Sequence, residues 1–149
     1  GRDGRPNAMT IGWGTVGVIW GKPIFTVLVR PSRYSYRLLE EGKAFTVCVP
    51  SEDLYDAVDF CGTRSGRDYD KFHECGLEPL PSLRVAVPGI AGAPVIYECQ
   101  VVHWNDAVPE HLTADIRASA YPSGDFHRVY FGEVLAVRAL PDAAALLET

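Results

Sequence analysis

Apolar runs with strand-like composition dominate the chain, and they are separated by turn residues. Such runs predict strands at residues 8–13, 15–20, 24–29, 44–49, 95–104, 114–121 and 126–139. The run at 24–29 is continuously apolar, which is typical of a buried strand. Gly21, Lys22 and Pro23 separate it from the run before it. Gly132, inside the last run, indicates a bulge or a bend.

Three short helices are predicted between these strands. They begin at Ser32, Ser51 and about Asp68, and they end before Gly42, before Gly62 and near residue 75. A fourth helix is predicted after residue 142. The segment at 78–94 holds four prolines and is expected to be mostly irregular.

Many strands with few helices, and without regular alternation of the two, favour an antiparallel barrel or sandwich. A length of 149 residues fits one domain, residues 1–149. Asp3-Gly4 is a hairpin turn signal with no strand before it. We interpret this as a sign that a strand upstream of Asn7 is missing from the sequence. A flexible tag remnant is the alternative.

The chain carries an excess of negative charge, with a formal net charge of -5. General nucleic-acid binding is disfavoured, because it needs an extended basic face. The most apolar stretch, residues 9–29, contains four glycines, a lysine and a proline, so no membrane span is predicted. No secretory signal is visible, and we interpret the chain as cytoplasmic with reduced thiols.

The cysteines and histidines show no metal-ligand spacing. None of the four cysteines forms a C-x-x-C pair, and the four histidines are widely separated. No metal site is therefore predicted. His127 follows a predicted turn at 122–125 and precedes the last strand. Taken by itself, its position favours an ordinary structural role.

Positive charge gathers in two segments, residues 30–35 and 61–72. Seven of the fourteen Lys and Arg residues fall between Arg30 and Lys71. Each segment leads into a predicted helix start, where backbone N–H groups and nearby cations favour a small anion such as phosphate. A capped helix with solvated charges is the alternative for each segment alone.

Four stretches of the chain, taken in order, resemble the flavin reductase-like family of FMN-binding split β-barrels, which includes flavoredoxins. They are NAMTIGW (7–13), RPSRYS (30–35), SGRDYDKF (65–72) and His127 with FGEV (131–134). The resemblance implies a mainly β fold, a six-stranded antiparallel Greek-key split β-barrel with short peripheral helices. It also implies a homodimer with one FMN per subunit near the dimer interface.

By the same resemblance, residues 7–10 would line the isoalloxazine edge of FMN, with Trp13 nearby. Residues 30–35 would follow the ribityl chain, and the residues around 65–71 would hold the phosphate. The implied cofactor-binding residues are Asn7, Ala8, Met9, Thr10, Trp13, Arg30, Ser32, Arg33, Tyr34, Ser35, Thr63, Ser65, Gly66, Arg67 and Lys71. His127 matches the family histidine near the approach of nicotinamide. The segment at 108–122 is longer and less regular than the family pattern.

The expected function is electron transfer from NAD(P)H through FMN to an acceptor, which could be a partner protein. One alternative is an FMN-binding electron carrier, or a flavin-binding protein, without NAD(P)H oxidation of its own. Another is a small-anion binding module unrelated to flavin.

Overall fold

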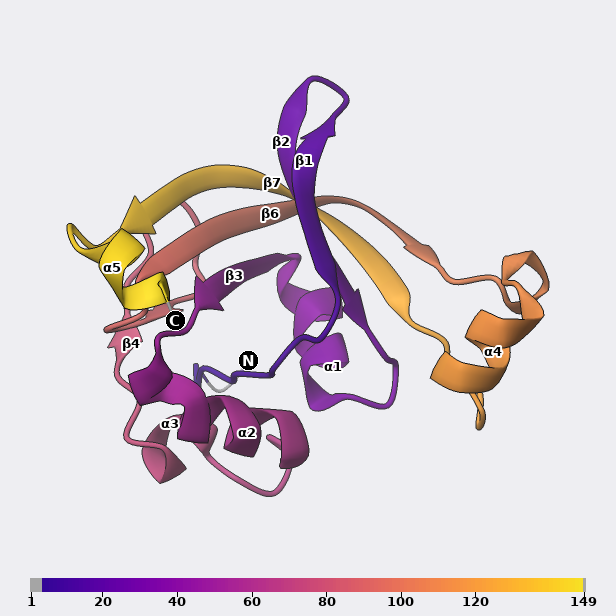
Figure 1. The fold of residues 1–149 in the computed structure, drawn as a ribbon, viewed down its shortest axis with the longest axis horizontal. Helices are drawn as coiled ribbons and strands as arrows, with labels where there is room; N and C mark the ends of the chain where they lie inside the picture. Colours follow the sequence, from indigo (N-terminus) through magenta and orange to yellow (C-terminus); the bar gives the residue numbers. More distant parts are fainter. Residues whose placement is uncertain (1–3, 149) are drawn as a thin grey trace.

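Five long strands form one antiparallel sheet in the order β1-β2-β7-β6-β3 (Figure 1). The computed structural model describes residues 4–148. The five strands are β1 (Gly14–Ile19), β2 (Lys22–Val29), β3 (Ala44–Val49), β6 (Val95–Asp106) and β7 (Arg128–Ala139). The strands predicted at 15–20, 24–29, 44–49, 95–104 and 126–139 are confirmed, with shifts of a few residues at their ends. Inside the segment at 78–94, the short strands β4 (Pro79–Leu80) and β5 (Gly89–Ile90) pair with each other.

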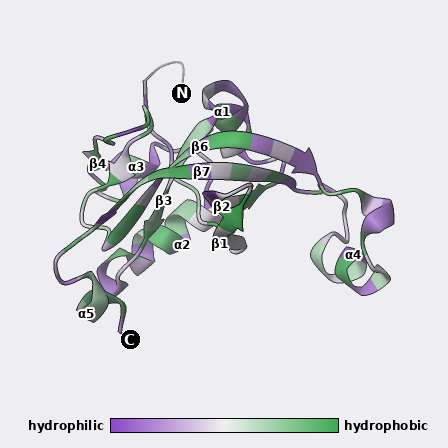
Figure 2. Cartoon of the chain, turned by 90° about the horizontal axis from the view of Figure 1, so that it is seen from above, coloured by the Kyte–Doolittle hydropathy of each residue, from purple (hydrophilic) through white to green (hydrophobic). Residues whose placement is uncertain are grey.

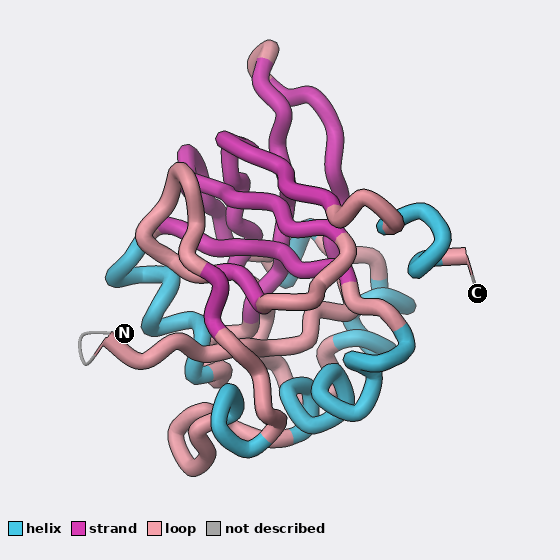
Figure 3. The backbone as a smooth tube through the Cα atoms, turned by 90° about the vertical axis from the view of Figure 1, so that its left-hand side faces the viewer, coloured by secondary structure: helices cyan, strands magenta, loops and turns pink. Residues whose placement is uncertain are grey.

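Short helices join the strands. They are α1 (Tyr34–Gly42), η1 (Glu52–Leu54), α2 (Tyr55–Thr63), α3 (Lys71–Glu74), η2 (Pro109–His111), α4 (Ala114–Ala120) and α5 (Ala143–Leu147). Figure 3 shows most of the helical turns below the strands, while the β1–β2 hairpin projects from the opposite end. Within residues 4–148, no helix combines the length and the apolar character that crossing a membrane requires.

The β1–β2 hairpin turns at Trp20 and Gly21, which have φ values of 55° and 69°. Positive φ at both central residues is the geometry of the tight hairpin turns whose twist matches that of the strands. Pro23, expected between two strands, lies inside β2 and pairs with Val18. β7 pairs with β2 only from Ile24 onward, so the missing N–H of Pro23 costs no hydrogen bond to β7.

The predicted strand at residues 8–13 is wrong, because this segment belongs to no strand of the structure. Hydrogen bonds to α1 and α2 hold it instead. The Asn7 amide donates to the Ser35 hydroxyl at 2.9 Å, and the Thr10 hydroxyl donates to the Val58 carbonyl in α2. Met9 and Ile11 pack against buried core residues, so the apolar residues of this segment reflect core contacts and not pairing in the sheet.

The expected six-stranded Greek-key split barrel is not confirmed among residues 4–148. The main sheet has five strands, and β1 and β3 form its two edges. The mainly β class with an antiparallel sheet and short helices is confirmed. Asp3, part of the turn signal behind the expected upstream strand, lies outside the described residues, so that strand stays a prediction.

The strand predicted at 114–121 is helix α4. Three alanines and an arginine favour helix, and Asp115 lies in the first turn, where a negative charge is favourable. No residue of α4 is buried, so no sheet face is available to select the strand conformation. Figure 2 shows α4 beyond the ends of β6 and β7, away from the rest of the sheet.

The hydrophobic core lies between the sheet and α1. Its buried cluster consists of Val27, Val29, Leu39, Phe45, Cys99 and Tyr130. Gly132 faces this cluster, where a Cβ atom would lie 2.5 Å from Cζ of Phe45 and 2.8 Å from Cβ of Cys99. Glycine at this position therefore leaves the space that the Phe45 ring fills.

Two irregularities interrupt the pairing of β6 with β7. One register shift lies between Val101 and His103, so Val102 is the extra residue, opposite the strand that carries Gly132. The other shift lies between Glu98 and Cys99, where Leu135 of β7 is extra. The bulge indicated by Gly132 is thus present next to it, with the extra residue on the partner strand.

Gly132→Ala is expected to lower the free energy of unfolding by roughly 1–3 kcal/mol, because the new methyl group overpacks the Phe45 ring. Urea unfolding of the purified protein measures this change. Gly17→Ala is the matched control, since a Cβ at this exposed hairpin position meets no atom within 4 Å. A Gly132→Ala protein as stable as the Gly17→Ala protein would contradict the packing role.

Candidate functional site

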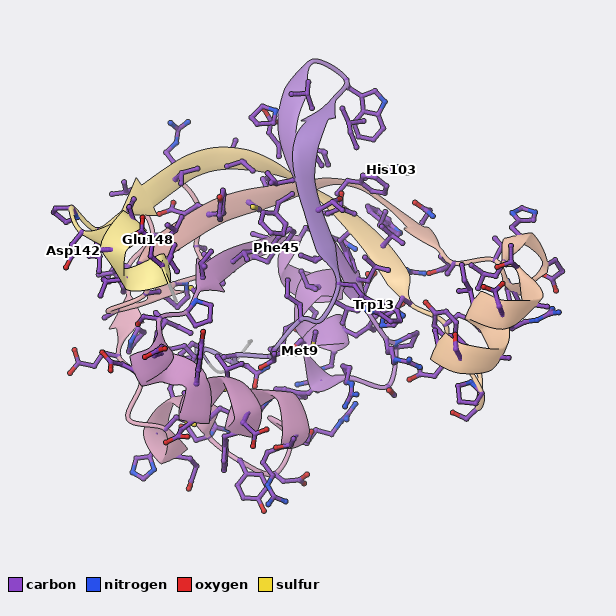
Figure 4. The ribbon with its side chains drawn as sticks, in the orientation of Figure 1. Met9, Trp13, Phe45, His103, Asp142 and Glu148 are labelled. Atoms are coloured by element: carbon purple, nitrogen blue, oxygen red, sulfur yellow. The ribbon has the colours of Figure 1, made fainter. Side chains whose placement is uncertain are left out.

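A cleft of about 290 Å³ lies where the extended N-terminal segment, the β2–α1 loop and the end of α2 meet. Its lining includes His127 and all of the predicted cofactor-binding residues except Ala8. Figure 4 shows Met9 in the extended segment and Trp13 just before β1. The structure therefore brings together residues that are more than one hundred positions apart in the chain.

Six lining residues were not predicted: Ile11, Gly12, Leu28, Cys61, Gly62 and Arg64. Five of them lie inside the two sequence segments at 7–13 and 61–72, so extending the motifs by position would have found them. Leu28 carried no signal of its own, because an apolar residue in a predicted buried strand does not indicate which cavity it borders. Burial raises the pKa of the Cys61 thiol to about 11, which keeps it neutral near pH 7.

Close approach of two loops depends on Gly66. A Cβ atom at this position would lie 2.1 Å from the Asn7 amide oxygen and 2.7 Å from the Tyr34 ring. Asn7 cannot move freely, since its amide group is hydrogen bonded to Ser35. Glycine at 66 thus lets the loop after α2 close against the N-terminal segment and form one wall of the cleft.

Lys71 is 4% exposed, and its ammonium group donates to two backbone carbonyls. The acceptors are Ala8 at 2.9 Å and Cys61 at 2.7 Å. Burial lowers the pKa of Lys71, since desolvation disfavours the charged form. Among the described residues, no carboxylate forms a salt bridge with it. Its positive charge is consequently available to the cleft.

Positive charge lines the cleft without any acidic side chain among the described lining residues. The cations are Arg30, Arg33, Arg64, Arg67 and Lys71. In a chain with a formal net charge of -5, such separation of charges creates a local positive potential. An anionic group is therefore the ligand that the cleft favours.

The two predicted helix starts differ from the structure. Arg33, not Ser32, precedes the first turn of α1, and the Ser32 hydroxyl donates to Asp125 at 2.5 Å. α3 begins at Lys71 and not at Asp68, because the Asp70 carboxylate accepts the His73 N–H at 3.3 Å and caps the helix. Four residues make a weak helix dipole, so the cationic side chains carry the electrostatic attraction here.

The turn at residues 65–69 is held by Ser65. Its carbonyl accepts the N–H groups of Asp68 and Tyr69, both at 3.1 Å. The Arg67 N–H donates to the Ser65 hydroxyl at 3.2 Å, and the Arg67 guanidinium donates to the Ser32 carbonyl at 3.0 Å. Arg67 thereby links this turn to the β2–α1 loop across the cleft.

Another part of the cleft wall contains His127, which is 9% exposed. Its Nδ1 lies 2.7 Å from the Tyr121 hydroxyl, and its ring centroid lies 5.0 Å from that of Trp13. Burial, followed by the charge of Arg30, lowers the pKa of His127. The ring is therefore expected to be neutral near pH 7.

Arg30 holds this wall in place. Its guanidinium donates to the carbonyls of Ala120 at 2.8 Å, Asp125 at 3.2 Å and Gly124 at 3.4 Å. It also lies over the Tyr121 ring, 5.1 Å from the centroid. A single side chain thus organises the loop that leads into His127. Within residues 4–148, no cluster of three or more His, Cys, Asp or Glu residues could hold a metal ion.

Two known proteins are similar to this chain in sequence. An uncharacterized protein of Archaeoglobus fulgidus is 34% identical over 98 residues, which is 66% of this chain and 55% of that protein. An uncharacterized protein of Pyrococcus abyssi is 29% identical over 106 residues, 71% of this chain and 60% of that protein. The chain therefore spans little more than half the length of these relatives.

Among solved structures, the flavoredoxin of Desulfovibrio vulgaris (Miyazaki F) superposes with a TM-score of 0.75 and 27% identity, covering 95% of this chain and 66% of that one. An FMN-binding protein of Thermus thermophilus, solved with p-hydroxybenzaldehyde, gives 0.68 and 26%, covering 92% and 66%. Residues 1–147 match the flavin reductase like domain. With this match and the cationic cleft, the chain belongs to the flavin reductase-like family.

Proposed function

We propose that the chain binds FMN in the cleft and transfers electrons from NAD(P)H through the flavin to an acceptor. The observation that carries the proposal is the lining of the cleft, which has five cationic side chains and no acidic one among the described residues. The phosphate of FMN is a dianion near neutral pH, so such a lining fits it. Gly66 lets the loop with Ser65 and Arg67 lie close to Asn7 and Tyr34, where a Cβ atom would clash.

The chain's residues divide the cleft into three parts in this proposal. Backbone and side chains of Asn7–Thr10, with Trp13, line the ring system. The β2–α1 loop at 30–35 follows the ribityl chain. The phosphate end is built from Thr63, Ser65, Gly66, Arg67 and Lys71. When bound, FMN supplies the redox chemistry, and the protein supplies binding, orientation and electrostatics.

In the proposed arrangement, His127 would lie beside the flavin ring system and orient the nicotinamide. It does not need to exchange a proton, because hydride transfer to a flavin requires no protein base there. The main alternative keeps the flavin site but lacks NAD(P)H oxidation, so that the protein receives electrons from another donor. A third possibility is a protein that binds a small anion in the cleft and does not bind flavin.

A homodimer and a cytoplasmic setting belong to this proposal. β1 is exposed along its whole length, and Val16, Val18 and Trp20 are 58%, 77% and 61% exposed. Exposed apolar residues on an edge strand and its turn are typical of a surface that another chain covers. An electron-accepting partner protein would need access to the flavin in such an assembly.

Anaerobic addition of NADH or NADPH tests the electron donor. We expect the purified protein to bind FMN, and we expect its visible flavin absorbance to bleach when one of the two nucleotides is added without oxygen. Dithionite, which reduces flavin directly, is the positive control. Bleaching by dithionite alone would favour the carrier, and failure to bind FMN would contradict flavin chemistry altogether.

Lys71→Met should weaken FMN binding by about ten-fold or more, because a charge-assisted contact to phosphate is worth roughly 1.5–3 kcal/mol. Methionine keeps much of the buried volume. The affinities for FMN and for riboflavin, which lacks the phosphate, are both measured by fluorescence titration. A loss of the phosphate contact weakens FMN binding alone, whereas a distorted cleft weakens the binding of both. Arg84→Met, outside the cleft, controls for net charge. Equal losses for FMN and riboflavin would mean that Lys71 acts only by holding Ala8 and Cys61.

Arg30→Lys should lower the free energy of unfolding by about 1–3 kcal/mol, because one ammonium group cannot replace a guanidinium that contacts three carbonyls. Arg33→Lys is the matched control in the same loop, since no hydrogen bond or ion pair of its guanidinium is recorded within residues 4–148. Thermal unfolding measures both. We expect the ratio of FMN to riboflavin affinity to stay unchanged in Arg30→Lys, and a drop in that ratio would assign Arg30 to the phosphate instead.

A further inference from the structure

Tyr121 lies between α4 and β7 and is 6% exposed, although it belongs to the segment that departs from the family pattern. Its ring stacks on Phe126, with centroids 4.7 Å apart and an angle of 29° between the planes. Trp13 meets it edge-on at 6.4 Å, and the Arg30 guanidinium covers it. Contacts on several sides thus fix the direction of its hydroxyl group.

The hydroxyl of Tyr121 and Nδ1 of His127 share a buried hydrogen bond of 2.7 Å. Two arrangements are chemically available, since either the phenol or the imidazole nitrogen can donate. If Nδ1–H donated, the phenol proton would be left without a recorded acceptor among the described residues. If the phenol donates, one bond satisfies both its proton and the Nδ1 lone pair. The cost of an unmade buried hydrogen bond favours the second arrangement.

A neutral imidazole whose Nδ1 accepts carries its proton on Nε2. No hydrogen bond of Nε2 is recorded within residues 4–148, and His127 borders the cleft. Nε2–H is therefore a donor that remains for a ligand. The charged groups that act on the ring are Arg30, Arg33 and Asp125. Both arginines disfavour a second proton, while Asp125 favours it.

We propose that Tyr121 is a positioning residue that locks His127 in the Nε2–H form, so that this wall of the cleft presents one fixed N–H donor and no acceptor. The ligand class that matches it is a flat ring bearing a carbonyl acceptor. This part rests on the proposed function, in which the carboxamide oxygen of a nicotinamide nucleotide is such an acceptor. His127 then orients the donor and cannot serve as a base, because its lone pair is already used.

Nitrogen-15 NMR of the histidine ring tests the tautomer in the flavin-free protein, without any reference to activity. We expect the His127 signals of the unaltered protein to show Nε2–H at neutral pH, with His127→Gln used for assignment. Tyr121→Phe keeps the ring and its stacking but removes the hydroxyl, and it should give a mixture of both tautomers. Tyr55→Phe, at a half-exposed residue outside the cleft, should leave the spectrum unchanged.

Kinetics supply the second readout. In Tyr121→Phe, KM for the nicotinamide nucleotide should rise about two-fold, because only about half of the His127 rings would then carry Nε2–H, while FMN affinity stays the same. An Nδ1–H tautomer in the unaltered protein, or an unchanged tautomer in Tyr121→Phe, would overturn the positioning role and leave flavin binding intact. An Nε2–H tautomer in a protein whose flavin NAD(P)H does not reduce would instead overturn the proposed donor. An unchanged KM in a reducible protein would overturn the assignment of the carboxamide.

Discussion

The buried ammonium group of Lys71 is the interaction on which the cleft depends. A charge removed from water must be compensated, and here two backbone carbonyls, of Ala8 and Cys61, accept its protons. Ala8 belongs to the extended N-terminal segment, whereas Cys61 belongs to α2. The two hydrogen bonds of the Lys71 ammonium group therefore hold the N-terminal segment against the end of α2. Carbonyl groups accept the protons of the ammonium group but carry no net charge, so its positive charge remains at the wall of the cleft.

Local patterns predicted most of the strands and failed where distant contacts decide the conformation. The strands near 24–29 and 44–49 have β-branched and aromatic residues that pack on a core, so their sequence and their environment agree. Residues 8–13 are similarly apolar, yet Met9 and Ile11 pack against the core without a paired strand, and the Thr10 hydroxyl donates to a backbone carbonyl of α2. Residues 114–121 have no core to face, and alanine then favours a helix.

Within the cleft, sequence motifs identified which residues gather but not how they act. Ser32 fits the pattern of a helix cap, while its actual partner is Asp125, 93 positions away. Arg30 looks like an anion ligand in the sequence, and in the structure its guanidinium organises a loop of carbonyls. Tyr121 had no motif at all, because its importance arises from a contact with His127 that only the folded chain creates. Residue types in the sequence thus indicated the kind of ligand, but tertiary contacts determined the role of each residue.

The two extra residues in the β6–β7 pair shift the register of the strands in opposite directions. Leu135 offsets the pairing by one residue, and Val102 on the other strand restores it. Val95 is opposite Ala139 at one end, and Asp106 is opposite Arg128 at the other. Deleting either bulge alone would shift the pairing of β6 and β7 by one residue beyond that point. The side chains of one strand would then face the opposite side of the sheet. The Ala107 N–H donates to the His127 carbonyl just past the Asp106–Arg128 pair. Compensation between two remote insertions thus determines which side of the molecule His127 faces.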